Sequence, residues 1–178
     1  IVNNLFRENQ SGRVPLVGVT GTHGKNAVAK MVAHLLYLSG QHAGLACKDG
    51  IYLGRRQAQK TSAANWEGGR RLLLNRAVQA AVIENGAPVI LGEGLAYDRC
   101  SIGIVTNIAL DQEDLSRWNV QPTGGEYYTT QRSTYRTQID VVLSNGHAIL
   151  NAEDELVADF AELCDGEVIF FACDQANP

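Results

Sequence analysis

A glycine-bearing loop between a strand-like and a helix-like segment is the feature that most restricts the fold of this chain. Residues 14–20 read VPLVGVT, a run rich in branched apolar residues, and residues 21–25 read GTHGK. The next segment, 26–40, places apolar side chains at helical spacing until Ser39-Gly40 ends the run. The sequence therefore predicts strand, glycine loop and helix, and a helix that opens behind such a loop favours a bound anion.

The rest of the chain repeats the alternation of strands and helices. Strands are predicted over 42–50, 80–84, 101–108, 147–151 and 167–173, with a short hairpin arm over 51–57. Helices are predicted over 65–79, 135–143 and 155–166, and the polar stretch 119–134 has no period and is predicted as a long loop. The pattern indicates an α/β fold, a mostly parallel sheet with helices on both faces, whose ligands bind at the carboxyl ends of the strands.

Length and charge restrict the class of protein. The chain has 178 residues, which is the size of one domain, and we assign 1–13 to a linker from a preceding domain and 14–178 to the domain itself. Nineteen acidic against fifteen basic residues give a net charge of −4, so no nucleic acid partner is expected. The basic doublets Arg55-Arg56 and Arg70-Arg71 are interpreted as solvated faces.

Location and cysteine usage point to an ordinary intracellular domain. No apolar run reaches the roughly 20 residues that span a bilayer, and the first residues lack the pattern of a secretory signal. We therefore expect a cytoplasmic protein without a membrane partner. Cys47, Cys100, Cys164 and Cys173 show neither metal-ligand nor redox spacing and are predicted to be buried free thiols.

The glycine loop has the chemistry of a nucleotide site. Gly21 and Gly24 let the backbone approach a phosphate, and Lys25 adds a positive charge for the β and γ oxygens of a triphosphate. The general phosphate-loop pattern also requires a glycine at position 19 and a Ser or Thr after the lysine. This chain has Val19 and Asn26 at those two positions, so the pattern fails at both ends.

Four longer strings carry a more specific resemblance. VTGTHGKNAVAKMVAHLL, DGIYLGRR, EGLAYDRCSIGIVTNIALD and HAILNAEDELVADFAELCDGEVIFF together resemble the central ATPase domain of the Mur ligase superfamily, and within it the cyanophycin synthetases. The resemblance runs over nearly the whole chain from residue 14. An unrelated phosphate-loop kinase or GTPase is the alternative that the loop alone leaves open.

The resemblance implies an ATP-dependent carboxylate–amine ligase that uses ATP and Mg²⁺. Such enzymes phosphorylate a carboxylate to an acyl phosphate, which an amine attacks to form an amide. In cyanophycin synthetases this domain is implied to join arginine to the aspartate side chain of a growing polymer of aspartate and arginine. The implied partners are that polymer, an ATP-grasp domain and a carboxyl-terminal domain of the same polypeptide, and further copies in a homo-oligomer.

The resemblance also assigns the site residues. Nucleotide contacts are implied for Thr20, Gly21, Thr22, His23, Gly24, Lys25, Asn26 and Asn107, with Lys25 as the catalytic residue. Asn26 and Glu84 are implied to hold Mg²⁺, if the ion binds. The alternatives are purely structural roles: Asn26 as a residue at the start of a helix and Glu84 as a solvent-facing strand end.

Several positions depart from the family pattern. The family loop has Asn where this chain has His23, and Thr or Ser where it has Asn26. The family's Arg-Gly-Gly segment corresponds to Ala87–Val89, and the His expected after Asp111 is Gln112. Losing groups that stabilise a transferring phosphoryl group costs about 10² to 10³ in rate for each group. We therefore predict a degenerate ATP/Mg site with a structural role, an active ligase domain being the alternative, and we place no catalytic residue in the loop 113–134.

Overall fold

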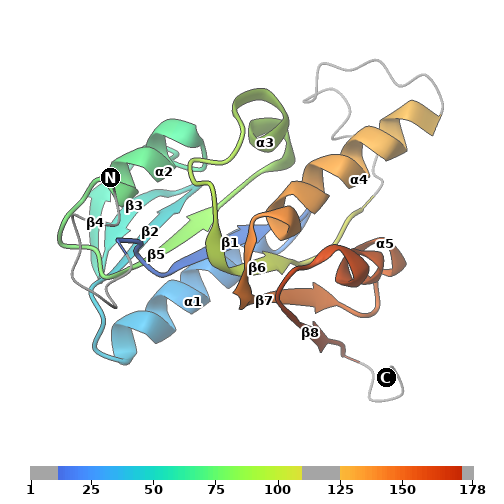
Figure 1. Cartoon of the computed structure of the whole chain (residues 1–178). Helices are drawn as coiled ribbons and strands as arrows, with labels where there is room; N and C mark the ends of the chain where they lie inside the picture. The colour runs from blue at the N-terminus through green and yellow to red at the C-terminus, as the bar shows by residue number, and fades with distance from the viewer. Residues whose placement is uncertain (1–11, 110–124, 174–178) are drawn as a thin grey trace.

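The computed structural model describes residues 12–109 and 125–173, and the side chains of the second range from residue 130 onward. An eight-stranded sheet runs through the molecule in the order β4-β3-β2-β5-β1-β6-β7-β8 (Figure 1). Its strands are β1 Leu16–Thr20, β2 Ala43–Cys47, β3 Gly50–Leu53, β4 Arg56–Gln59, β5 Ala80–Glu84, β6 Cys100–Val105, β7 Val142–Asn151 and β8 Glu167–Phe171. β3 pairs antiparallel with both of its neighbours, β2 and β4, as the predicted hairpin arm requires, and the other pairings among the described strands are parallel.

Helices cover both faces of the sheet, which confirms the predicted α/β class. The helices are α1 Lys25–Leu38, α2 Trp66–Leu73, α3 Ala87–Glu93, α4 Gly125–Asp140 and α5 Glu155–Ala158, and the 3₁₀ helix η3 spans Asp159–Leu163. Apolar residues of α1 pack on one face, against Val19, Val82 and Ile104. The other helices pack on the opposite face, which the strands supply with alternate residues because their side chains point to opposite sides in turn.

The predicted loop 119–134 is wrong where it can be compared, because residues 125–134 belong to α4. Residues 113–124 of the predicted loop 113–134, like residues 1–11 of the predicted linker, lie outside the described residues. The inward side of α4 consists of Gln131, Thr134, Tyr135, Gln138 and Ile139, which recur at helical spacing and are all buried. Three of the five are polar, so a search for apolar periodicity does not detect this helix.

Other boundaries differ from the predicted ones for similarly local reasons. The helix predicted over 135–143 ends at Asp140, and β7 begins at Val142 instead of residue 147. The helix predicted over 155–166 consists of α5 and η3. α3 was not predicted, although it has Pro88 in its first turn and Gly94 directly after its end, at a φ of 79°.

The cysteines and helices test two further expectations. All four cysteines are free, but only Cys47 and Cys100 are buried, and Cys173 is exposed, so the prediction of buried thiols is wrong for Cys173. Among the helices that the structure describes, none is long and apolar enough to cross a membrane.

Candidate functional site

The glycine loop lies at the carboxyl end of β1, in the middle of the sheet. β1 pairs with β5 on one side and with β6 on the other, and both pairings are parallel. The chain moves from β1 outward to β2, back to β5, and then across β1 to β6, so the strand order reverses at this point. A reversal of this kind leaves a crevice outside the carboxyl ends of the strands, which is where open α/β sheets bind ligands.

Two glycines give the loop its shape. Gly21 has a φ of 135°, and a Cβ at this position would lie 2.0 Å from the Thr106 hydroxyl oxygen. Gly24 has a φ of 79° and is the N-cap residue of α1, with open space where a Cβ would be. No side chain in the described ranges accepts a hydrogen bond as the cap of α1, which leaves the amide groups of its first turn without a side-chain acceptor. The backbone at Gly24 and the start of α1 therefore fit an anion.

Asn107 holds the loop through its side chain and its backbone. Its side-chain oxygen accepts from the His23 amide at 2.9 Å, and its side-chain nitrogen donates to the His23 carbonyl at 3.0 Å. Its carbonyl accepts from the Thr22 amide at 2.9 Å, and the Thr106 hydroxyl also donates to the His23 carbonyl, at 2.7 Å. The structure thus brings Asn107 and the loop together, with Asn107 as a positioning residue.

The two threonine hydroxyls of the loop point into the protein. Thr20 is buried and donates to the Asn85 carbonyl at 2.8 Å. The Thr22 hydroxyl lies 3.2 Å from the Tyr135 hydroxyl and accepts from the Ala109 amide at 3.0 Å. Both hydroxyls therefore stabilise the fold of the loop.

The side chains of Asn26 and Glu84 meet, although they are far apart in the sequence. Glu84 ends β5 beside Val19, on the face of the sheet that α1 covers. The Asn26 side-chain amide donates to Glu84 Oε2 at 2.9 Å, and the Lys48 backbone amide donates to the same oxygen at 2.7 Å. Glu84 is 2% exposed, so it is not a solvent-facing strand end. Asn26 does not cap α1 either, because the N-cap is Gly24.

This arrangement does not match a pair of magnesium ligands. Mg²⁺ takes oxygen ligands in a nearly ideal octahedron, whereas Asn26 turns its N–H groups toward the carboxylate. Asn26 also acts as a donor toward a second carboxylate, Asp49. The pKa of Asp49 lies below its usual value, mainly because of its hydrogen bond to Lys30 and to a smaller extent because of Asn26. Over residues 12–109 and 125–173, no three His, Cys, Asp or Glu residues gather as a metal site. Asp111 and Gln112 lie outside that part of the chain.

Lys25 folds back on the loop. Its ammonium group donates to the Thr22 carbonyl at 3.2 Å, and the side chain is half-buried. Lys25 is the first residue of α1 and directly follows Gly24. The charge of Lys25 is therefore hydrogen-bonded within the loop, and its catalytic role stays a prediction.

Residues 87–89, which the resemblance sets against the family's Arg-Gly-Gly segment, belong to a helix. Ala87 is the first residue of α3 and is 3% exposed, packed in a cluster with Tyr135 and Ile139. The residue at this position is a buried methyl group, and it brings no charge to the crevice.

A buried polar network beneath β1 was missed by the sequence analysis. The Asn85 side-chain amide donates to the Tyr97 hydroxyl at 2.7 Å, and both groups donate to the side-chain oxygen of Gln138, at 3.0 and 2.7 Å. A Cβ on Gly18 would lie 2.2 Å from the Tyr97 hydroxyl, so only glycine leaves room for the network. Burial raises the pKa of Tyr97, which keeps its hydroxyl as a donor. Gly18 and Gly103, paired in the middle of the sheet, were the available signal of a close approach.

Comparisons with known proteins connect this geometry to a family. No family model matches the chain. It is 32% identical over 179 residues to a cyanophycin synthetase of Crocosphaera subtropica and 30% identical over 180 residues to that of Synechocystis, which covers 99% and 100% of this chain. The chain is a relative of the cyanophycin synthetases. It spans about a fifth of the length of these two enzymes, 20% of each.

Solved structures show that this relative of the cyanophycin synthetases has the fold of a Mur ligase central domain. A UDP-N-acetylmuramoyl-L-alanyl-D-glutamate–2,6-diaminopimelate ligase superposes with a TM-score of 0.69 at 15% identity, over 92% of this chain and 33% of that one. A pseudomurein peptide ligase type C of Methanothermus fervidus superposes with a TM-score of 0.59 at 18% identity, over 90% of this chain and 27% of that one.

Proposed function

We propose that the chain is the Mur ligase-like central domain of a cyanophycin synthetase-type protein, with a degenerate ATP/Mg site and a structural role in a longer polypeptide. The observation that carries this proposal is the state of Glu84. Its Oε2 atom already accepts two protein N–H groups, from Asn26 and from the Lys48 backbone. A buried carboxylate that already accepts hydrogen bonds from protein groups gains less from binding a metal ion than a carboxylate without such donors.

Asn26 can coordinate Mg²⁺ only if its hydrogen bond to Glu84 is broken. To offer its oxygen it must turn its amide over, which removes the hydrogen bond to Glu84 and sets two oxygens against each other. A hydroxyl at this position, as in the family pattern, is shorter and carries an oxygen whichever way it turns. The exchange of hydroxyl for amide therefore supports the loss of the metal site rather than its preservation.

The loop keeps the parts that bind phosphate and lacks those that complete the reaction centre. Bound ATP with Mg²⁺ would supply the phosphoryl group that converts a carboxylate into an acyl phosphate. The amides at Gly24 and the start of α1 fit its phosphates, and Lys25 would orient them after leaving the Thr22 carbonyl. At Ala87 the crevice has a buried methyl group where the resemblance implies an arginine. Binding without turnover is the result of such a combination.

A second candidate function is an active ligase domain that joins arginine to the aspartate side-chain carboxylate through an acyl phosphate. The uncapped start of α1, with open space at Gly24 and Lys25 beside it, is the observation that favours it. In this case Asn26 and Glu84 would hold Mg²⁺ in an altered coordination.

One substitution separates the two candidates when it is made in the longer polypeptide. A degenerate domain gives no arginine-dependent ATP hydrolysis of its own, so Lys25→Ala leaves that rate unchanged. An active domain loses about 10²-fold or more, because the ammonium group stabilises the transferring phosphoryl group. Lys60→Ala, at an exposed lysine after β4, is the matched control and should change nothing in either case. A Lys25-specific loss of that size would refute the structural role.

A further inference from the structure

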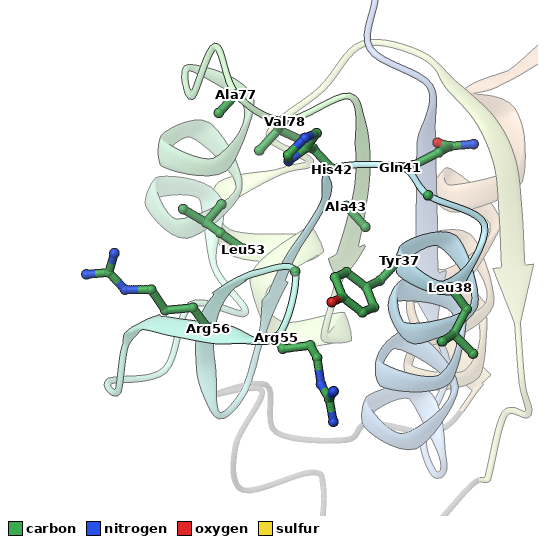
Figure 2. A pocket seen from close by; sticks show the side chains of 12 residues that line it. Tyr37, Leu38, Gln41, His42, Ala43, Leu53, Arg55, Arg56, Ala77 and Val78 are labelled. Carbon is green, nitrogen blue, oxygen red and sulfur yellow. The ribbon is translucent and has the colours of Figure 1, made fainter.

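A pocket of about 630 Å³ lies at the end of the sheet opposite to the glycine loop (Figure 2). The carboxyl end of α1 forms one wall and the turn between β3 and β4 forms another, while Ala43 marks the amino end of β2 at its base. The glycine loop follows the carboxyl end of β1, which is parallel to β2 through β5. The pocket is therefore separate from the candidate nucleotide site.

Apolar residues form the interior of this pocket. Ala43 and Val78 are buried, Leu53 is half-buried, and the ring of Tyr37 faces them from α1 in Figure 2. The wall made by the hairpin is packed against that ring, since a Cβ on Gly54 would lie 3.2 Å from it. The interior and the hairpin wall of the pocket are therefore formed by residues that pack in the fold.

The rim of the pocket is basic. His42, Arg55 and Arg56 line it, and none of its lining residues is acidic. In Figure 2 both arginine side chains extend outward from the hairpin, Arg56 toward the left and Arg55 downward. Gly54, with a φ of 56°, and Arg55 form the turn between β3 and β4, and Arg56 is the first residue of β4.

Among the described residues, neither Arg55 nor Arg56 forms an ion pair or a side-chain hydrogen bond. Five other arginines are paired with Asp or Glu, namely Arg13, Arg70, Arg71, Arg132 and Arg136. Arg99 donates to the Asp140 carbonyl, and Arg76 has no such partner either within the described ranges. The net charge of the whole chain is −4, yet two guanidinium groups without an acidic partner in the described part of the chain lie beside this apolar hollow. The interpretation of Arg55-Arg56 as a merely solvated face leaves the hollow beside them unexplained.

A smaller cavity of about 370 Å³ continues the pocket along α1. The two share Tyr37, Ala43, Gly54 and Arg55, and the smaller one extends to His34 and Tyr52. Together they form a groove with an apolar base, aromatic sides and a basic rim.

We propose that this groove binds a carboxylate-bearing organic ligand whose apolar body enters the pocket. The apolar part would lie on Ala43, Leu53 and Val78, and the carboxylate would pair with the guanidinium group of Arg55 or of Arg56 at the rim. A planar guanidinium group pairs with a carboxylate through two parallel hydrogen bonds, and volumes of about 300–1,000 Å³ are typical of ligand pockets. The carboxylate can belong to a free organic acid or to an acidic side chain of a peptide segment, since both present the same chemistry.

Titrations followed by NMR test this proposal with defined probes. Phenylpropionate represents the free acid, and the blocked peptide acetyl-Glu-Phe-Glu-amide represents the acidic segment. The neutral probes phenylpropionamide and acetyl-Gln-Phe-Gln-amide have the same shapes without the charge. We expect saturable shifts of the Ala43, Gly54 and Val78 amide signals with at least one acidic probe, and binding about tenfold weaker with its neutral counterpart.

Variants of the rim assign the charge effect to the arginines. Arg55→Glu or Arg56→Glu should weaken the acidic probe about tenfold, while Lys60→Glu, the same change of charge at an exposed residue outside the pocket, should leave its binding unchanged. The tighter of the two acidic probes identifies the source of the carboxylate. The proposal is overturned if neither acidic probe gives saturable shifts, if the neutral probes bind equally well, or if Lys60→Glu weakens binding as much as the rim variants.

Discussion

The hydrogen bond between Asn26 and Glu84 leads to a quantitative prediction for Asn26→Ala. In the parent chain Glu84 Oε2 accepts from the Asn26 side chain at 2.9 Å and from the Lys48 amide at 2.7 Å. The substitution removes the first of these donors. Glu84 is 2% exposed, whereas Asn26 is half-buried, so water replaces the lost donor only in part.

The expected loss follows from two opposing contributions. A hydrogen bond to a charged group contributes about 1.5–3 kcal/mol to the free energy of unfolding. Alanine is the better helix former and returns up to about 0.7 kcal/mol at this position in α1. We therefore expect Asn26→Ala to lower the free energy of unfolding by about 1–2 kcal/mol.

Urea unfolding of four proteins measures this coupling: the parent, Asn26→Ala, Glu84→Gln and the double variant. In the Glu84→Gln background the charged acceptor is gone, so Asn26→Ala should cost less than about 0.5 kcal/mol. A cost of Asn26→Ala within about 0.3 kcal/mol of zero, or an equal cost in both backgrounds, would refute the view that Asn26 is a partner of this carboxylate.

Three further predictions concern the fold. Gly18→Ala should lower stability by about 1–3 kcal/mol, because its Cβ overlaps the buried amide and phenol network, and an unchanged urea midpoint would contradict the packing. Burial raises the pKa of Cys100 to about 12, so a thiol reagent should modify exposed Cys173 rapidly in the native chain and Cys100 only after unfolding; Cys173→Ser should remove the fast phase. Arg13 lowers the pKa of Asp98 from 3.8 to about 2, so Asp98 stabilises the fold above pH 3.8, and this contribution is lost as the pH falls toward 2. Since the pair is exposed, Asp98→Asn should cost under about 1 kcal/mol at pH 7, and the difference should vanish near pH 2 in thermal melts.

The sequence is informative where one residue type dominates an element. The strands β1, β5 and β6 consist almost wholly of apolar residues because both faces of a parallel sheet are covered, and this pattern predicts them directly. The hairpin and the glycine loop are predicted from the glycines at their turns, Gly54 in the hairpin and Gly21 and Gly24 in the loop. Strand order, by contrast, depends on which distant strands pair, and periodicity carries no information about that.

Elements with a polar buried side escape the same reasoning. α4 places Gln131 and Gln138 inward, and their burial depends on partners from other elements, such as the Ala109 carbonyl and Tyr97. Similarly, the resemblance predicts that Asn26 and Glu84 lie in one site, but it does not predict the direction in which the Asn26 side-chain amide points. That direction follows from the register of β5 against β1 and from the start of α1, which only the folded structure contains.

Calorimetry with Mg-ATP is the most direct test of a degenerate site. Because the phosphate loop is retained while Asn26 and Glu84 are hydrogen-bonded to each other, we expect ATP to bind only weakly and Mg²⁺ to add nothing to its affinity. The longer polypeptide should then show no turnover from this domain. Micromolar binding of ATP that requires Mg²⁺, accompanied by arginine-dependent turnover in the longer polypeptide, would contradict the proposal.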